Sequence, residues 1–316
     1  MKLLRITSPL LIFFAFSVAN TAFALTISPV KIEVTGDPGQ TVRGEMELYN
    51  DQAETKTFFS SFENFEPSGD TGTPHFIGGA SGLATWLGTN TEIEVPSSGK
   101  ASIPYSITIP KDAEPGGYFA AIFWGTSDPR TQEAGEVSIG GKLGVLILLR
   151  VSGDIEEKAG ISEWQADGKK RVFTDLPIDF SYRFANSGGD RVVPLGDIVI
   201  TNSFGKNAVT LKANTNEGSV LPSSSRKFTA VWDSATVHAN KNFFAVAKEQ
   251  MQNFHFGVYT AHLHIVWGAS NTPETEAFRF LIIPWQLLLL CSALLVVLFL
   301  GLKQYNKWII AKSVSK

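Results

Sequence analysis

Alternation of apolar and polar residues runs through most of the chain. The segments 42–49, 101–109 and 178–184 change character at every second position, which is the period of a strand with one buried and one wet face. Turn-forming sequences such as Asn186-Ser187-Gly188-Gly189 separate these segments. Short alternating strands between such turns predict antiparallel β-sandwiches.

Two halves of this β-rich region share an order of features. Each has a Pro-Ser-Ser turn, at 96–98 and 222–224, followed by an alternating strand. Each then has a strand of the pattern Gly…Tyr…Trp-Gly, at 117–125 and 257–268. This order indicates one domain repeated twice, and chance similarity between β-rich segments is the alternative.

The length of the region also fits two domains of about 125 residues each. We place the boundary near Gly153 and expect Ig-like sandwiches at 25–153 and 154–279. The second carries an insertion at about 234–256, within which a short helix is expected at 244–251.

An apolar segment follows the β-rich region. Residues 280–302 contain no charged side chain and are long enough for a helix to cross a hydrocarbon core of about 30 Å. The tail 303–316 carries four lysines, so the positive-inside rule places it in the cytoplasm. The fold class is therefore expected to be all-β, two tandem Ig-like β-sandwiches followed by one C-terminal transmembrane helix. A buried core helix is the alternative interpretation of 280–302.

Residues 1–24 have the features of a secretory signal peptide. Lys2 and Arg5 precede the apolar run 9–18, and Ala22-Phe23-Ala24 has the small-x-small pattern of a cleavage site. An uncleaved signal anchor is the alternative. Both interpretations place 25–279 outside the cytoplasm, in the periplasm or on the cell surface, as the ectodomain of a single-pass membrane protein.

Charge and cysteine usage narrow the class of protein. All 30 acidic residues precede residue 280, so the exported part is acidic, which argues against nucleic acid as a partner. The only cysteine, Cys291, lies in the apolar segment. The exported part therefore has no disulfide and no cysteine metal site, and this favours a bacterial cell envelope.

Candidates for catalysis are few. His262 and His264 are spaced to share one strand face and could supply half of a zinc or copper site, but no carboxylate with metal-ligand spacing accompanies them. No Gly-x-Ser-x-Gly elbow or phosphate-binding loop occurs. The glycines between 69 and 88 are interpreted as a long flexible loop. We expect no catalytic residue and no cofactor.

Two segments, 118–124 and 143–149, are apolar on both faces. A sandwich strand needs only one apolar face, so something must cover the other. The cover is either the second domain or a loop, or the face binds an exported protein partner, by docking or by strand addition. The candidate partner-binding residues are Phe119, Phe123, Leu146 and Leu148.

Several segments resemble a known family. Gly39-Gln40-Thr41 with Leu48-Tyr49-Asn50 resembles the opening of the WxL-interacting proteins and equally that of the first domain of periplasmic pilus chaperones. Ala84-Thr85-Trp86-Leu87, the segment 107–118 and the overall layout resemble the first group more closely. That resemblance implies a bacterial surface scaffold with tandem Ig-like domains, which binds partner proteins and also peptidoglycan. It brings no catalytic residues.

The sequence thus predicts a membrane-anchored envelope protein that acts by non-covalent binding. One alternative is a membrane-tethered cell-wall hydrolase, which would require carboxylates converging in a cleft. Another is an accessory subunit of a membrane complex, with Gln286 and Ser292 facing a neighbouring helix.

Overall fold

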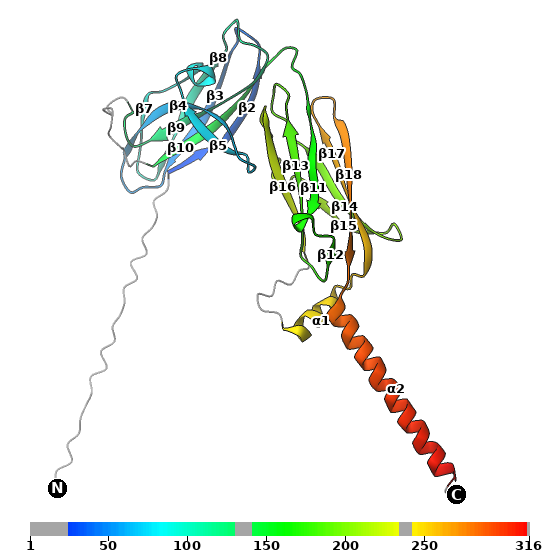
Figure 1. Cartoon of the computed structure of the whole chain (residues 1–316). Helices are drawn as coiled ribbons and strands as arrows, with labels where there is room; N and C mark the ends of the chain where they lie inside the picture. The colour runs from blue at the N-terminus through cyan, green and yellow to red at the C-terminus, as the bar shows by residue number, and fades with distance from the viewer. Residues whose placement is uncertain (1–24, 130–140, 234–241, 315–316) are drawn as a thin grey trace, which may run out of the picture.

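The computed structural model describes residues 25–129, 141–233 and 242–314. The expected signal peptide, 1–24, lies outside these residues. The described strands form four sheets, which pair around two hydrophobic clusters that share no residue. Figure 1 shows the two β bodies in succession, followed by a long helix. The chain is mostly β with a C-terminal apolar helix, as expected. We refer to the N-terminal sandwich (β1–β10) and the C-terminal sandwich (β11–β18).

The N-terminal sandwich pairs a four-stranded and a six-stranded sheet. The first has the order β1 (Leu25–Ser28), β3 (Thr41–Asn50), β8 (Gly99–Thr108) and β6 (Leu87–Thr89). The second has the order β2 (Lys31–Gly36), β10 (Lys142–Val151), β9 (Gly116–Gly125), β4 (Lys56–Ser68) and β5 (Thr73–Gly78), with β7 (Glu92–Val95) also on β4. Pro29 has no amide hydrogen to continue a ladder, and it separates β1 in one sheet from β2 in the other.

The alternating segments occupy these strands as predicted. β3 and β8 pair along their whole length, and Met46, Leu48, Ile103 and Ile107 all turn into the core. Gly44 lies opposite Tyr105, whose hydroxyl oxygen and nearest ring atoms would come within 2.3–2.7 Å of any Cβ at this position. Glycine is required here because the aromatic ring fills the space of a side chain.

The C-terminal sandwich pairs a three-stranded and a five-stranded sheet. The first has the order β11 (Ala159–Ala166), β13 (Ile178–Asn186) and β16 (Ser224–Trp232). The second has the order β12 (Val172–Phe173), β18 (Thr272–Ile282), β17 (Gly257–Trp267), β14 (Leu195–Asn202) and β15 (Asn207–Lys212). A tight turn, Asp167–Lys169, in which all three residues have positive φ, connects β11 to β12.

A buried asparagine at the end of β3 and of β13 shows how the two sandwiches correspond. Asn50 Nδ2 donates to the carbonyls of Val95 and Pro96, and Asn186 Nδ2 donates to that of Val220. Asn50 pairs with Gly99 and Asn186 with Ser224, so Val95 and Val220, each four residues before that partner, correspond. The sequence analysis matched the two Pro-Ser-Ser turns residue by residue. In the structure, the second turn is shifted by one residue relative to the first.

The C-terminal helix begins later than expected. Residues 280–282, assigned from the sequence to the membrane span, complete β18, and Phe280 is buried in the core. Only Ile283 and Pro284 separate β18 from α2 (Trp285–Val314). The expected short helix within the insertion is present as α1 (Phe243–Gln252). The sequence placed the start of the apolar helix too early because Phe280, Leu281 and Ile282, which end β18, are as apolar as the helix that follows.

Candidate functional site

The four candidate partner-binding residues lie together on the outer face of β9 and β10. Phe119 is directly opposite Leu148, and Leu146 lies opposite Ala121, between Phe119 and Phe123 along the strands. Gly144 lies opposite Phe123, whose ring would come within 2.7 Å of a Cβ at 144. The face is not open, since Phe123 and Leu148 are only 6% and 4% exposed while Phe119 and Leu146 are half-buried.

The cover is the β4–β5 hairpin of the same sandwich. The ring of Phe65 on β4 lies 6.0 Å from that of Phe119, and Phe76 on β5 meets Phe123 edge-on at 4.8 Å. Lys142 Nζ lies 4.3 Å from the centre of the Phe123 ring. The sequence analysis left the second domain or a loop as the cover, and the structure has instead a paired strand hairpin of the first sandwich over Phe119 and Phe123.

Asn64 is the residue where the hairpin leaves the sheet. β4 pairs with β9 as far as Asn64, and beyond it pairs only with β5. Its side-chain amide donates to the carbonyls of Gly78 and Ser81 and accepts from the N–H of Ala84 at 2.9 Å. These bonds fix the base of the hairpin.

The interpretation of residues 69–88 as a flexible loop is wrong. This segment includes the turn of the hairpin, β5, the 3-10 helix Gly82–Thr85 and β6. Its glycines are needed for conformation, since Gly69, Gly72, Gly78 and Gly82 have positive φ. A run of turn-forming residues, 68–72, between two segments with aromatics was the available hairpin signal.

The turn of the hairpin reaches the C-terminal sandwich. The carboxylate of Asp70 forms an ion pair with Arg183 on β13, and its backbone carbonyl accepts from the N–H of Lys227 on β16 at 2.7 Å. The hydrogen bond from Arg183 lowers the pKa of Asp70. A Cβ at Gly72 would lie 2.8 Å from the guanidinium of Arg226, so the turn packs closely against β16.

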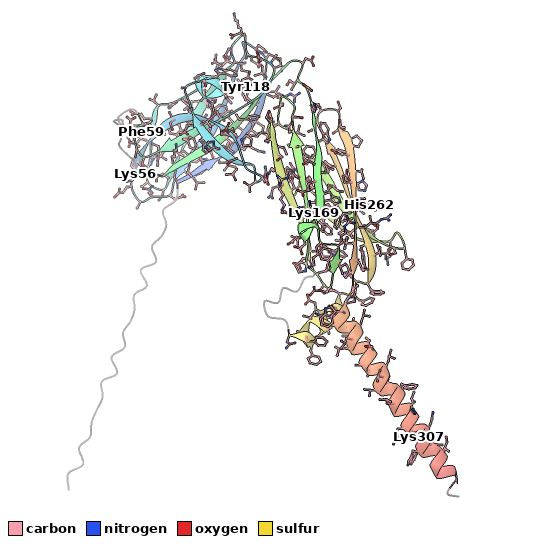
Figure 2. The ribbon with its side chains drawn as sticks, in the orientation of Figure 1. Lys56, Phe59, Tyr118, Lys169, His262 and Lys307 are labelled. Atoms are coloured by element: carbon pink, nitrogen blue, oxygen red, sulfur yellow. The ribbon has the colours of Figure 1, made fainter. Side chains whose placement is uncertain are left out.

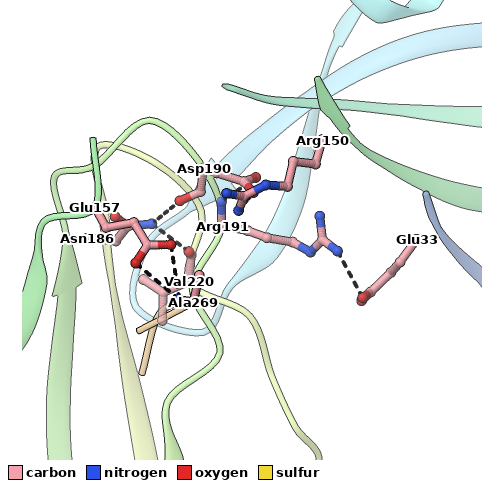
Figure 3. A network of polar contacts seen from close by, with 8 residues as sticks. All are labelled: Glu33, Arg150, Glu157, Asn186, Asp190, Arg191, Val220 and Ala269. Atoms are coloured by element: carbon pink, nitrogen blue, oxygen red, sulfur yellow. Dashed lines mark hydrogen bonds and ion pairs between the residues drawn. The ribbon is translucent and has the colours of Figure 1, made fainter. Parts of the chain in front are cut away.

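A second set of polar contacts connects the sandwiches, as Figure 3 shows. Arg150 on β10 pairs with the buried carboxylate of Asp190 at 2.8 Å, and Arg191 pairs with Glu33 on β2 at 3.0 Å. The N–H of Gly117 donates to the carbonyl of Gly189 at 2.9 Å. The 186–191 turn therefore holds the ends of β2, β9 and β10 in place.

The charge of Glu33 depends on its cationic neighbours. Burial by itself would raise the pKa of Glu33, but hydrogen bonds and charge from Lys31 and Arg191 hold the pKa below its ordinary value. The sequence analysis found neither the Glu33–Arg191 pair nor the Asp70–Arg183 pair, because the partners are far apart in the sequence and no periodic pattern connects them.

The histidine pair lies elsewhere. Figure 2 shows His262 on the C-terminal sandwich, away from Tyr118 on β9 of the N-terminal sandwich. The rings of His262 and His264 stack at 6.1 Å, and His264 Nδ1 contacts the hydroxyl of Thr275 at 3.2 Å. Within the described part of the chain, no group of three or more His, Cys, Asp or Glu residues is placed to hold a metal ion.

Comparisons with known proteins find similarity in structure alone. No family model and no curated protein matches the sequence. The class 5 fimbriae chaperone CfaA aligns at 14% identity and a TM-score of 0.39 over 83% of this chain and 100% of its own. The Escherichia coli chaperone DraB aligns at 13% identity and a TM-score of 0.34, over 82% of this chain and 97% of its own. A chain of the CsuC–CsuE chaperone–tip subunit complex from Acinetobacter baumannii aligns at 10% identity and a TM-score of 0.36, over 82% of this chain and 99% of its own.

These solved structures are pilus chaperones or contain one, which matches the second resemblance in the sequence. The resemblance to WxL-interacting proteins stays a prediction. At such identities and TM-scores, the matches carry no argument about what this chain binds.

Proposed function

We propose that the chain is a membrane-anchored envelope protein that captures an exported protein partner on its N-terminal sandwich. The observation that carries the anchoring is α2, whose residues 285–302 carry no charged side chain and whose most apolar 18-residue window is not buried in protein. A helix that is apolar on all sides and uncovered requires a lipid environment. The two-residue link from β18 then holds the C-terminal sandwich next to the bilayer.

The proposed topology follows from the charges at the two ends. Residues 25–153 and 154–282 form two exported Ig-like domains, the second extended to the end of β18, and the signal peptide 1–24 directs their export. The lysine-bearing tail 303–316 lies in the cytoplasm, because cytoplasmic ends of spans carry an excess of Lys and Arg. Binding of peptidoglycan belongs to the same proposal and is supported by the family resemblance alone.

The proposed binding face is the apolar surface under the hairpin. Beyond Asn64 the hairpin is a two-stranded ribbon, and such ribbons have little stability of their own. Its turn is held by one partly exposed ion pair, Asp70–Arg183, whose attraction solvent weakens. A partner that presents apolar side chains to Phe119 and Leu146 can therefore replace Phe65 and Phe76.

Locking the hairpin tests this mode of capture. The hydrogen bond between Asp70 and Lys227 brings their Cα atoms within reach of a disulfide, which spans about 4.4–6.8 Å. The full chain would carry Asp70→Cys and Lys227→Cys on a Cys291→Ser background. A photoreactive phenylalanine at Leu146 reports contact in native membranes, and one at Val172, exposed on β12, is the control.

We expect one partner to crosslink at position 146 under reducing conditions, and its yield to fall on oxidation and return with reductant. Position 172 should give no such product in either state. Equal yields in the locked and reduced protein would show that the hairpin need not move. Absence of any product at 146, with the chain intact in the membrane, would place the binding face elsewhere.

A further inference from the structure

Exposed aromatic side chains are concentrated at one end of the C-terminal sandwich. Among described residues before α2, the phenylalanines, tyrosines and tryptophans that rank as exposed are Phe204, Phe244, Phe254 and Phe256. They are 94%, 70%, 57% and 56% exposed, and Met251 is exposed beside them. Exposed apolar groups that gather in one region mark an interaction surface, whereas scattered ones are normal.

The strand register places three of these residues, Phe204, Phe254 and Phe256, near the start of α2. Gly257 pairs with Ile282, the last residue of β18, so Phe254 and Phe256 lie just beyond the end of that ladder. Asn202 pairs with Tyr259 at the same end, and Phe204 follows in the β14–β15 turn, where Ser203 bonds to the carbonyl of Val258.

The helix α1 is fixed in this region by its cap and its contacts with α2. The side chain of Asn242 caps its first turn by accepting from the N–H of Ala245 at 2.8 Å. Gln250 donates to Gln286 at 2.7 Å and accepts from the N–H of Leu287 at 3.0 Å. Phe243 meets Trp285 edge-on at 5.8 Å. Figure 1 shows α1 beside the first turn of α2, below the sandwich.

The two sides of α1 differ in a way that suits a lipid headgroup region. Val246, Ala247, Glu249 and Gln250 turn inward and are buried. Phe244 and Met251 turn outward on either side of Lys248. The only acidic residue of the helix is thus on the buried side, while the exposed residues include Phe244, Met251 and the cation Lys248, with Gln252 at the last position. A lysine in this setting can extend its ammonium group to lipid phosphates while its stem remains among apolar groups.

We propose that α1 and the adjacent Phe254–Phe256 segment dock on the bilayer surface and embed their exposed apolar side chains at the boundary of headgroups and acyl chains. This docking rests on one part of the proposed function, namely that α2 spans the membrane. Interfacial helices of this kind bury their apolar face by about 5–10 Å. The C-terminal sandwich is then attached to the membrane at two places, α2 and α1, which restricts its tilt.

Spin labels on the full chain test this docking. Single cysteines would replace Phe244, Met251 or Val258 on a Cys291→Ser background, and the proteins would be reconstituted in phosphatidylethanolamine–phosphatidylglycerol vesicles. Val266→Cys is a matched control, since Val258 and Val266 lie at opposite ends of β17 with exposures of 47% and 41%. Leu295→Cys in α2 reports insertion of the span itself.

We expect labels at 244, 251 and 258 to collide more with oxygen than with an aqueous nickel complex, as the label at 295 does, and the label at 266 to show the reverse. Preference for nickel at 244 and 251, with oxygen preferred at 295, would overturn the docking and leave the anchor intact. Low collision with both reagents would indicate a second protein or a second copy on this surface and would equally overturn it. Preference for nickel at 295 would overturn the anchor as well.

Discussion

Asp70, in the turn of the β4–β5 hairpin, forms an ion pair with Arg183 on β13 of the other sandwich. The hairpin that covers Phe119 and Phe123 is thus also the element that reaches across to the C-terminal sandwich. Docking of the hairpin and the arrangement of the two sandwiches are therefore expected to change together.

Neutralising Asp70 should loosen the hairpin. In Asp70→Asn the charge is removed, and we expect spin labels at Ile77 on β5 and Val172 on β12 to show a broader distance distribution than in the unaltered chain. Asp167→Asn, which removes a surface pair with Lys170, is the control and should leave the distribution unchanged. Identical distributions for all three proteins would mean that this ion pair does not hold the hairpin.

Acid should have the same effect on the unaltered chain. Because Arg183 lowers the pKa of Asp70, the docked form favours the carboxylate. The stabilisation is complete above the ordinary Asp pKa of about 4 and is lost as the pH falls through the lowered value. The same labels should report broadening only below about pH 4, and Asp70→Asn should lack this transition. A transition of equal size in Asp70→Asn would assign it to other groups.

Two glycines in the hairpin turn separate backbone strain from packing. Gly69 and Gly72 both have positive φ, but only a Cβ at Gly72 would meet a side chain, that of Arg226 at 2.8 Å. Arg226 has little room to retreat, because a Cβ at Gly218 would also come within 2.8 Å of its guanidinium. Each alanine should cost about 1–2 kcal/mol for the left-handed backbone. Gly72→Ala should in addition broaden the distribution of distances between the spin labels at Ile77 and Val172. A similar broadening in Gly69→Ala would contradict the close contact.

The buried asparagines should each stabilise their own sandwich. Asn186 Nδ2 donates to the carbonyls of Asp190 and Val220, and its Oδ1 accepts from the N–H of Gly188 at 2.9 Å. Asn186→Ala leaves these groups unpaired and should lower the free energy of unfolding by about 3 kcal/mol or more. Asn50→Ala should do the same in the N-terminal sandwich. Denaturant unfolding measures both effects, and Asn207→Ala, an exposed site on β15, should change stability by less than about 0.5 kcal/mol.

His255 should make the C-terminal sandwich sensitive to mild acid. Its ring packs against Trp232 at 4.8 Å, and burial lowers its pKa below the ordinary value. The folded state therefore favours the neutral ring, and stability should decline as the pH falls below about 6.5. In His255→Phe this decline should be absent from the thermal unfolding midpoint between pH 7 and 5. His75→Phe, at an exposed position on β5, should keep it.

The sequence was sufficient to predict those strands whose own residues show the alternating pattern. Alternation located β3, β8 and β13, because each has one dry and one wet face. The doubly apolar character of β9 and β10 was also visible, and it placed Phe119 and Leu148 on one face. The cover could not be predicted, because Phe65 and Phe76 reach that face only through the bend at Asn64. The start of α2 was missed because apolar residues occur on both sides of it. Phe280 is apolar because it packs in the sandwich core, and Leu287 is apolar because it belongs to the proposed membrane span.

Protease accessibility of the chain in intact spheroplasts tests the central claim, anchoring with both sandwiches outside the cytoplasm, most directly. The account predicts that added protease degrades the chain before Trp285 and spares an epitope placed after Lys316. Removal of that epitope, with the sandwiches left intact until the membrane is permeabilised, would contradict it.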